Sequence, residues 1–258
     1  MGYCRRSRSP GTSEYSVHLA GHCGLLRAVF ALHALGLIFL ALAGCRAETG
    51  TSEREPSFRD QLAAVKSGTS DQIHVSEPIS DAEIAEVAGA DGLKSLIIDT
   101  AEANISASTL DRLRALPALE MFWFRGRGIN DAGLGKLATI KTLKVLNVPQ
   151  GEFSDAGLVA LKGLPNLVQL RFGSPHVTDE GIASLAEIPT LLRLHLIDVA
   201  ITGQGLQSLA RLESLESLYI DGGKFGDADI DVLFRARPQL HVHFNQQHHD
   251  RDPHKHDH

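Results

Sequence analysis

Cysteine is rare in this chain of 258 residues, and its three cysteines, Cys4, Cys23 and Cys45, all lie near the N-terminus. Residues 46–258 therefore contain neither a disulfide framework nor a cysteine metal site. Aromatic residues are also scarce, at 5%, although 43% of the residues are hydrophobic. The chain is long enough for a sizeable core, and that core must consist mainly of aliphatic side chains.

The chain also lacks the short motifs of common catalytic and cofactor sites. It has no Gly-rich phosphate loop, no Cys-x-x-Cys, no His-Glu-x-x-His and no Gly-x-Ser-x-Gly sequence. His195 and Asp198 are candidate bases, but no nucleophile is predicted beside them. The formal net charge of −6 disfavours nucleic acid as a partner, since phosphate binding needs a basic surface. We therefore expect neither an enzyme nor a nucleic-acid-binding protein.

Long hydrophobic runs are absent apart from residues 28–43, and these sixteen residues are fewer than the roughly 20 that a membrane-spanning helix needs. Arg27 precedes the run, and Leu42-Ala43-Gly44-Cys45 closes it. This order of features predicts a secretory signal over residues 1–44. The closing tetrapeptide resembles the lipobox of bacterial lipoproteins, which implies cleavage before Cys45 and lipidation of Cys45; an uncleaved anchor is the alternative. Without residues 1–44, which hold four arginines and one glutamate, the formal charge changes from −6 to −9.

What the chain does contain is an apolar pattern that recurs every 24 residues between Leu119 and Pro238. Each copy has the form apolar-x-x-apolar-x-apolar, and the copies begin at Leu119, Leu143, Leu167, Leu191 and Leu215. The last two apolar positions share one face of an extended segment, because strand side chains alternate. A fixed period of this length predicts a solenoid, in which each unit is stable only when it is stacked on its neighbours.

The second half of each period predicts a short helix, because leucine or isoleucine recurs at every third residue. A polar pair precedes each helix, at Asn130-Asp131, Ser154-Asp155 and Thr178-Asp179. The first member is a good N-cap, and the aspartate suits the first turn, so we expect capping rather than catalysis. Glycines two residues after the aspartate position are expected to let the helix and strand layers approach, at Gly133, Gly157, Gly181 and Gly205.

With these units the chain resembles leucine-rich repeat proteins over about residues 80–244. The Thr/Ser-Asp-x-Gly-Leu-x-x-Leu half resembles the ribonuclease-inhibitor-like and F-box-associated variety. The resemblance implies an α/β solenoid with short parallel strands on a concave face and short helices on a convex face. The chain departs from the family where an Asn or Cys usually lines the turn, with Arg127, Gly151, Pro175, Val199 and Gly223 at that position. Backbone groups in the turn must then bond to water or to other backbone groups.

Composition divides the chain further. Residues 45–56 are polar and are expected to form a flexible tether. Residues 57–92 combine helical spacing, a short apolar strand and a capping-box sequence, and are expected to form an N-terminal cap with a degenerate repeat. The leucine-rich repeat domain then covers residues 93–244. Residues 245–258 are polar and His-rich and are expected to be disordered.

Function is expected on the strand side chains that alternate with the buried leucines and point away from the core. Aromatic and arginine side chains, which are frequent anchors of protein interfaces, occur among these positions. The predicted protein- or peptide-binding residues are Met121, Trp123, Arg125, Asn147, Arg171, Arg193, His195, Tyr219 and Asp221.

Histidine is concentrated at the C-terminal end. Along residues 240–244 it alternates with apolar residues, and we expect Val242 and Phe244 rather than His243 to face the core. Candidate ligands for zinc, copper or nickel in the tail are His248, His249, His254, His256 and His258. A solvated tail with incidental metal affinity is the plainer interpretation of the same composition.

The leading hypothesis is an exported, lipid-anchored bacterial module, on the periplasmic side or at the cell surface, that binds an unidentified protein or peptide through its concave face. The F-box-associated resemblance implies a ubiquitin-ligase adaptor as an alternative, which the signal-like segment disfavours. A metal-handling lipoprotein that uses the His-rich tail is the third hypothesis.

Overall fold

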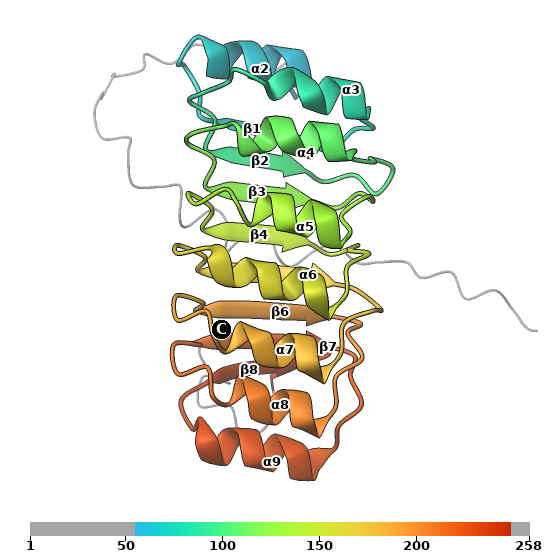
Figure 1. Ribbon diagram of the computed structural model, residues 1–258, viewed down its shortest axis with the longest axis vertical. Coiled ribbons are helices and arrows are strands. Elements are labelled where there is room, and N and C mark those ends of the chain that lie inside the picture. The colour runs from blue at the N-terminus through green and yellow to red at the C-terminus, as the bar shows by residue number, and fades with distance from the viewer. Residues whose placement is uncertain (1–54, 249–258) are drawn as a thin grey trace, which may run out of the picture. The chain divides into compact units, whose positions relative to one another are not determined.

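The computed structural model describes residues 55–248, which form two layers, a sheet on one side and a row of short helices on the other (Figure 1). The strands are β1 (Gln72–Val75), β2 (Ser95–Ile98), β3 (Met121–Phe124), β4 (Val145–Val148), β5 (Gln169–Gly173), β6 (Arg193–Ile197), β7 (Ser217–Asp221), β8 (His241–Phe244) and β9 (Gln247–His248). The first eight strands pair in parallel and in sequence order, and β9 pairs antiparallel with β8.

From β1 to β8, one helical segment connects each strand to the next along the other layer, and α2 precedes β1. The α-helices are α2 (Phe58–Lys66), α3 (Asp81–Ile84), α4 (Ala107–Arg114), α5 (Asp131–Leu137), α6 (Asp155–Ala160), α7 (Asp179–Leu185), α8 (Gly203–Leu209) and α9 (Asp227–Ala236). Short 3-10 turns, η1 (Ala85–Val87) and η2 (Leu161–Gly163), extend α3 and α6. The predicted repeat of strand, turn, short helix and return is confirmed.

The buried row of leucines predicted from the repeat lies between the two layers. Leu146, Leu170, Leu194 and Leu218 are paired in register on neighbouring strands, and each is at most 1% exposed. Burial of such a side chain stabilises the fold by roughly 1.5–3 kcal/mol. Because each unit covers the leucines of the units beside it, the core exists only in the stack.

The helices begin at the three predicted N-caps, Asn130, Ser154 and Thr178, and α8 begins in the same way at Thr202. Asn130, Ser154, Thr178 and Thr202 are extended residues whose side chains accept a hydrogen bond from a backbone N–H two or three residues later. These bonds satisfy donors that the first turn of a helix leaves free. The helices that follow have only six or seven residues, so packing rather than intrinsic helicity stabilises them.

Three aspartates of the first helical turn each join their own repeat to the next. The carboxylate of Asp155 accepts hydrogen bonds from the backbone N–H of Thr178, at 2.8 Å, and from its hydroxyl, at 2.7 Å. The same pair of bonds connects Asp131 with Ser154 and Asp179 with Thr202. Each aspartate does lie in the first turn of its own helix, but its hydrogen bonds go to the N-cap residue of the following one. We call these three connections the aspartate ladder.

The glycines beside the ladder have a different role from the predicted one. A Cβ at Gly157, Gly181 or Gly205 would lie 2.6, 2.2 or 2.5 Å from a carboxylate oxygen of the aspartate in the preceding repeat. Those distances are far shorter than a van der Waals contact. The glycines therefore make room for the aspartate ladder between neighbouring helices, rather than for an approach of helix and strand layers.

Backbone groups satisfy the turn in which the Asn or Cys of the family is missing. The N–H of Arg127 donates to the carbonyl of Ala103, and the N–H of Ile105 donates to the carbonyl of Arg127. In a later turn, the N–H of Gly151 donates to the carbonyl of Gly173. Of the two predicted solutions, bonds to other backbone groups are the one seen at these positions.

The C-terminal end of the stack closes with a hairpin. Val242 is fully buried and Phe244 packs against the core, which confirms the predicted orientation of β8. Asn245 and Gln246, both with positive φ, form a two-residue turn of the kind that suits the twist of a hairpin. The sequence places residues 245–248 in the disordered tail, whereas in the structure residues 245–246 form a turn and residues 247–248 form β9, because this turn lets β9 pair with β8.

Candidate functional site

The sheet face opposite the helices, which we call the open face, carries two columns of side chains that run across the strands. The first column contains Ser95, Met121, Val145, Gln169, Arg193, Ser217 and His241. The second contains His74, Ile97, Trp123, Asn147, Arg171, His195, Tyr219 and His243. All are half-buried or exposed except Asn147, which is buried. With Arg125 and Asp221 at strand ends, the predicted partner-binding residues share this face.

Arg171 is the centre of a hydrogen-bonded row across four strands. Its Nη1 donates to Oδ1 of Asn147, and its Nε donates to Nδ1 of His195, both at 3.2 Å. His195 Nε2 in turn lies 2.9 Å from Oδ2 of Asp221. Asn147 is only 3% exposed, so it positions Arg171 and offers little surface of its own. We call these four residues the Arg171 row.

The hydrogen bonds of the row define the tautomer of His195. Arginine only donates, so Nδ1 accepts and Nε2 carries the proton that is donated to Asp221. Burial lowers the pKa of His195; the bond to Asp221 opposes this shift, and the charge of Arg171 reinforces it. Burial also lowers the pKa of Arg171, but a guanidinium stays charged. At neutral pH the row is therefore a positive and a negative group joined through a neutral imidazole.

The N-terminal half of the predicted site has fewer polar contacts. Met121 Sδ accepts a hydrogen bond from Ser95 Oγ at 3.4 Å. Arg125 forms an ion pair with Asp99 at 3.2 Å, and such an exposed pair contributes about 0–1 kcal/mol. The indole Nε1 of Trp123 is buried and has no hydrogen-bond partner among the described residues. Packing, one hydrogen bond to sulfur and one weak ion pair hold this half, in place of a connected network.

The C-terminal half contains two histidines that were not among the predicted site residues. The ring of Tyr219 stacks on His243 with centroids 4.3 Å apart, and lies 5.5 Å from the ring of His195. His241 approaches the same tyrosine edge-on at 5.9 Å. The alternation along residues 240–244 already placed His243 outward, and extending the 24-residue register by one strand would have added both histidines to the columns. Exposed Arg193, in the first column, donates from Nε to Gln169 Oε1 at 3.1 Å.

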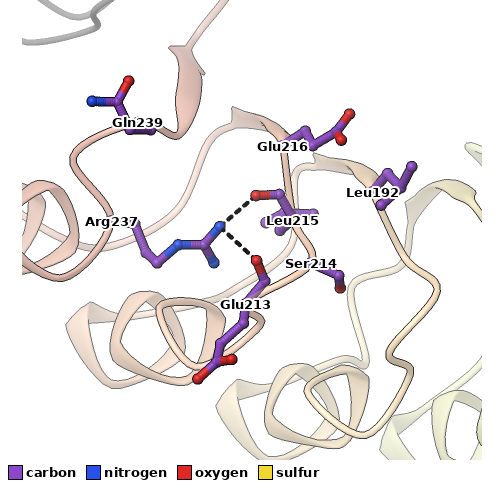
Figure 2. Close-up of a pocket in the computed structure, with 7 residues that line it drawn as sticks. All are labelled: Leu192, Glu213, Ser214, Leu215, Glu216, Arg237 and Gln239. Atoms are coloured by element: carbon purple, nitrogen blue, oxygen red, sulfur yellow. Dashed lines mark hydrogen bonds between the residues drawn. The ribbon is translucent and has the colours of Figure 1, made fainter.

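A hollow of about 660 Å³ lies at the edge of the stack, where Arg237 approaches the chain just before β7 (Figure 2). It is lined by Leu192, Glu213, Ser214, Leu215, Glu216, Arg237 and Gln239. Arg237 donates to the carbonyls of Glu213, at 3.1 Å, and Leu215, at 2.6 Å (Figure 2). In earlier units a Thr or Ser hydroxyl just before the strand makes the equivalent bond. Pro238 occupies that position here and has no hydroxyl, so the guanidinium in this hollow completes the fold.

Several predicted features lie outside the described residues: the signal over residues 1–44, the lipidation site Cys45, and His249, His254, His256 and His258. His248 is described only by its backbone, in β9. Within residues 55–248, no helix is long and apolar enough to cross a membrane. The side chains described over the same range include no group of three or more His, Cys, Asp or Glu arranged to hold a metal ion.

No protein-family model matches the chain, and a search of curated proteins finds no significant relative. Among solved structures, internalin C2 from Listeria monocytogenes is similar, with a TM-score of 0.51 and 19% identity over 70% of this chain and 72% of that one. A second internalin from the same organism aligns with a TM-score of 0.46 and 16% identity, over 61% of this chain and 49% of that one. Together with the stacked strand–helix units, the likeness to internalin C2 identifies the fold as a leucine-rich repeat solenoid.

Proposed function

We propose that this protein is a non-enzymatic interaction module that binds a protein or peptide across the open face, and that it is exported and held at a membrane by a lipid on Cys45. The Arg171 row is the observation that supports partner binding across the open face. It joins the positive charge of Arg171 to the negative charge of Asp221 by hydrogen bonds in a row that spans four strands, and it uses no residue of the repeat consensus. A partner of extended shape can follow the columns of such a face.

The types of side chain around the row support this proposal. Trp123 lies two strands before Arg171 in the second column, and Tyr219 lies two strands after it. Arginine, tryptophan and tyrosine are the side chains that most often dominate binding energy at protein interfaces. Because Asn147 and His195 already hold the guanidinium of Arg171, a partner meets an ordered group and less entropy is lost on binding.

The test is a quantitative pull-down with the open face altered. We expect Trp123→Ala combined with Arg171→Ala to reduce affinity for the partner at least about thirtyfold, since loss of even one hot-spot side chain costs about 2 kcal/mol or more. The matched control, Arg114→Ala combined with Val159→Ala, removes an exposed arginine and the exposed valine from the helix layer. Equal capture by the two double variants would remove the open face as the binding surface.

Export and lipidation are supported by the sequence, in which an arginine, an apolar segment and Leu42-Ala43-Gly44-Cys45 follow one another. The experiment is a mass measurement of the mature N-terminus. We expect the chain to begin at Cys45 with a mass increase equal to a lipid, and Cys45→Ser to abolish both the cleavage and the membrane fraction. A mature chain that keeps residues 1–44, or an unmodified Cys45, would contradict the lipid anchor without affecting the proposal for the open face.

A further inference from the structure

The open face changes its chemistry between β4 and β5. On β5 and β6 its columns carry two arginines, half-buried Arg171 and exposed Arg193. On β2, β3 and β4 they carry four half-buried apolar side chains, which pair in register across neighbouring strands, Ile97 with Trp123 and Met121 with Val145. An apolar and a cationic surface therefore follow one another along the stack of strands.

Neutral acceptors orient both arginines. Arg171 donates to the amide oxygen of Asn147 and to a ring nitrogen of His195. Arg193 donates to the amide oxygen of Gln169, on the strand that also carries Arg171. An amide oxygen and a neutral imidazole nitrogen accept hydrogen bonds without a negative charge. These contacts therefore hold the two guanidinium groups in place and leave their positive charge.

Neither arginine has a carboxylate in direct contact. Among residues 55–248, the ion pairs include Arg125 with Asp99 on the same face, but neither Arg171 nor Arg193. Burial is the largest influence on the pKa of Arg171 and lowers it, and the nearby carboxylates, Asp221 first among them, do not reverse this shift. Its Nη2 also donates to no acceptor in the described part of the chain. Arg171 thus keeps free N–H groups for a carboxylate, which a guanidinium binds through two parallel hydrogen bonds.

Strand spacing sets the distance between the apolar and the cationic surface. Neighbouring strands lie about 4.8 Å apart, so across the strands Trp123 on β3 is about 10 Å from Arg171 on β5 and about 14 Å from Arg193 on β6. An extended peptide rises about 3.3 Å per residue, so four residues cover about 13 Å. Side chains four residues apart also point to the same side of an extended peptide. One extended peptide can therefore place an apolar side chain beside Trp123 and an acidic one beside the two arginines.

We propose that the partner lays an extended segment across the strands of the open face, with an apolar side chain packed at Trp123 and an aspartate or glutamate, about four residues away, bound between Arg171 and Arg193. This inference rests on the proposed binding of a partner to the open face, and it adds the chemistry of the segment that binds.

The test uses the fluorescence of Trp123, the only tryptophan of the chain, as a reporter on this face. The probe is a nine-residue peptide with leucine in the middle, glutamate at both ends and serine elsewhere, so that a glutamate lies four residues from the leucine in either chain direction. Titration should change the tryptophan emission until it saturates. A peptide with glutamine in place of both glutamates should bind at least about tenfold more weakly. A peptide of the same composition with both glutamates next to the leucine should be weakened as much, because adjacent side chains point to opposite sides of an extended peptide.

Arg193 supplies the matched variants, because it lies outside the Arg171 row. Arg193→Gln should weaken binding of the glutamate peptide about tenfold and leave binding of the glutamine peptide within about twofold. Arg193→Glu should weaken the glutamate peptide further and strengthen binding of a peptide with lysine in place of both glutamates. The control Arg114→Gln, in α4 on the helix layer, should bind all peptides as the wild type does. Urea midpoints check that each variant is folded.

The inference is overturned if the wild type binds the glutamate and glutamine peptides equally, if Arg193→Gln weakens both alike, or if the glutamate peptide gives no response up to about 1 mM. The pull-down with Trp123→Ala and Arg171→Ala tests partner binding separately. Loss of capture in that pull-down, together with equal binding of the two peptides, would keep the open face as the binding surface and remove only the acidic segment.

Discussion

The two sides of this solenoid are built on opposite rules. On the helix side, the same residue type recurs every 24 positions and makes the same contact, as Asp131, Asp155 and Asp179 do with the N-cap of the next helix. On the open face, the second column changes at every strand, from tryptophan to asparagine, arginine, histidine and tyrosine. Repetition therefore marks what stacks the units, and variation marks where a specific contact is possible.

The helix side also shows what happens when its repetition stops. Gly203 replaces the aspartate of the ladder, and Gly226 replaces the hydroxyl N-cap of the next helix. Asp229, within the same helix, then accepts a hydrogen bond from the N–H of Gly226. A Cβ at residue 203 would lie only 2.1 Å from its carboxylate, so Gly203 leaves the space that this carboxylate occupies. The loss of one repeated contact is thus offset by a local one, whereas the open face shows no such compensation because it has no repeated contact to restore.

The largest loss of stability is expected from a change in the buried leucines between the helices and the sheet, on which both sides depend. Leu170→Ala should lower the free energy of unfolding by about 2–5 kcal/mol, because the cavity lies between strands that pack against it on both sides. Val159→Ala, at the exposed valine of α6, should change it by less than about 0.5 kcal/mol. Urea denaturation followed by circular dichroism measures both. A cost below 1 kcal/mol for Leu170→Ala would mean that the units do not depend on stacking.

A second, smaller effect concerns the glycines of the helix side. Gly181→Ala should destabilise the protein by about 1–3 kcal/mol, since the new methyl displaces the carboxylate of Asp155. Gly135→Ala is the matched change, because it lies within α5 with no atom within 4 Å of its Cβ, and it should stabilise the helix by about 0.5–1 kcal/mol. Equal effects at the two sites in urea denaturation would show that space for the ladder does not matter.

The ladder itself should contribute less than the glycines that accommodate it. Asp155→Ala removes two hydrogen bonds to Thr178 and should cost about 1–2 kcal/mol. Asp227→Ala removes the aspartate at the same place in α9, which no helix follows among residues 55–248, and should cost only the helix-dipole interaction of about 0.3–1 kcal/mol. In the Asp155→Ala background, Gly181→Ala should become much less costly. Strict additivity of these two changes would contradict the proposed contact.

The sequence predicted the repeated side well, with one gap. Register, buried leucines and N-caps follow from spacing alone, because side-chain direction in strands and caps is a local property. The partner of Asp155 lies 23 residues away, so no local rule identifies it. The signal was nevertheless present: Gly181 follows Asp155 with the same offset as Gly205 follows Asp179.

The candidate site was predictable only as a list of columns. Alternation places Asn147, Arg171 and His195 on the open face, but it does not show that Asn147 is buried or that the three are hydrogen-bonded. Those contacts depend on rotamers of long side chains on neighbouring strands, and sequence period carries no information on rotamers. The turn at residues 245–246 was missed because its polar composition also suits a disordered tail.

The smallest effect expected is a dependence of stability on pH. It distinguishes the two sides because, among residues 55–248, the hydrogen bonds that include a histidine ring lie on the open face. The pKa of His195 is lowered in the folded protein by burial, with Arg171 reinforcing and Asp221 opposing the shift. The unfolded chain, with a pKa near 6.5, therefore binds a proton at a higher pH than the folded one. Stability from this residue is complete above about pH 6.5 and is lost as the pH falls from there through the folded pKa.

Protonation of His195 also has a structural consequence at the centre of the open face. A proton on Nδ1 turns the acceptor of the Arg171 bond into a donor, so Arg171 loses one of the two contacts that hold it. Urea midpoints at pH 7.5 and 5.5 should therefore differ more for the wild type than for His195→Gln, while His176→Gln, at an exposed histidine, should follow the wild type. An identical pH dependence for wild type and His195→Gln would show that the imidazole is not held neutral by the row. A confirmed difference would mean that mild acid removes the contact from His195 to the arginine that is proposed to meet the partner.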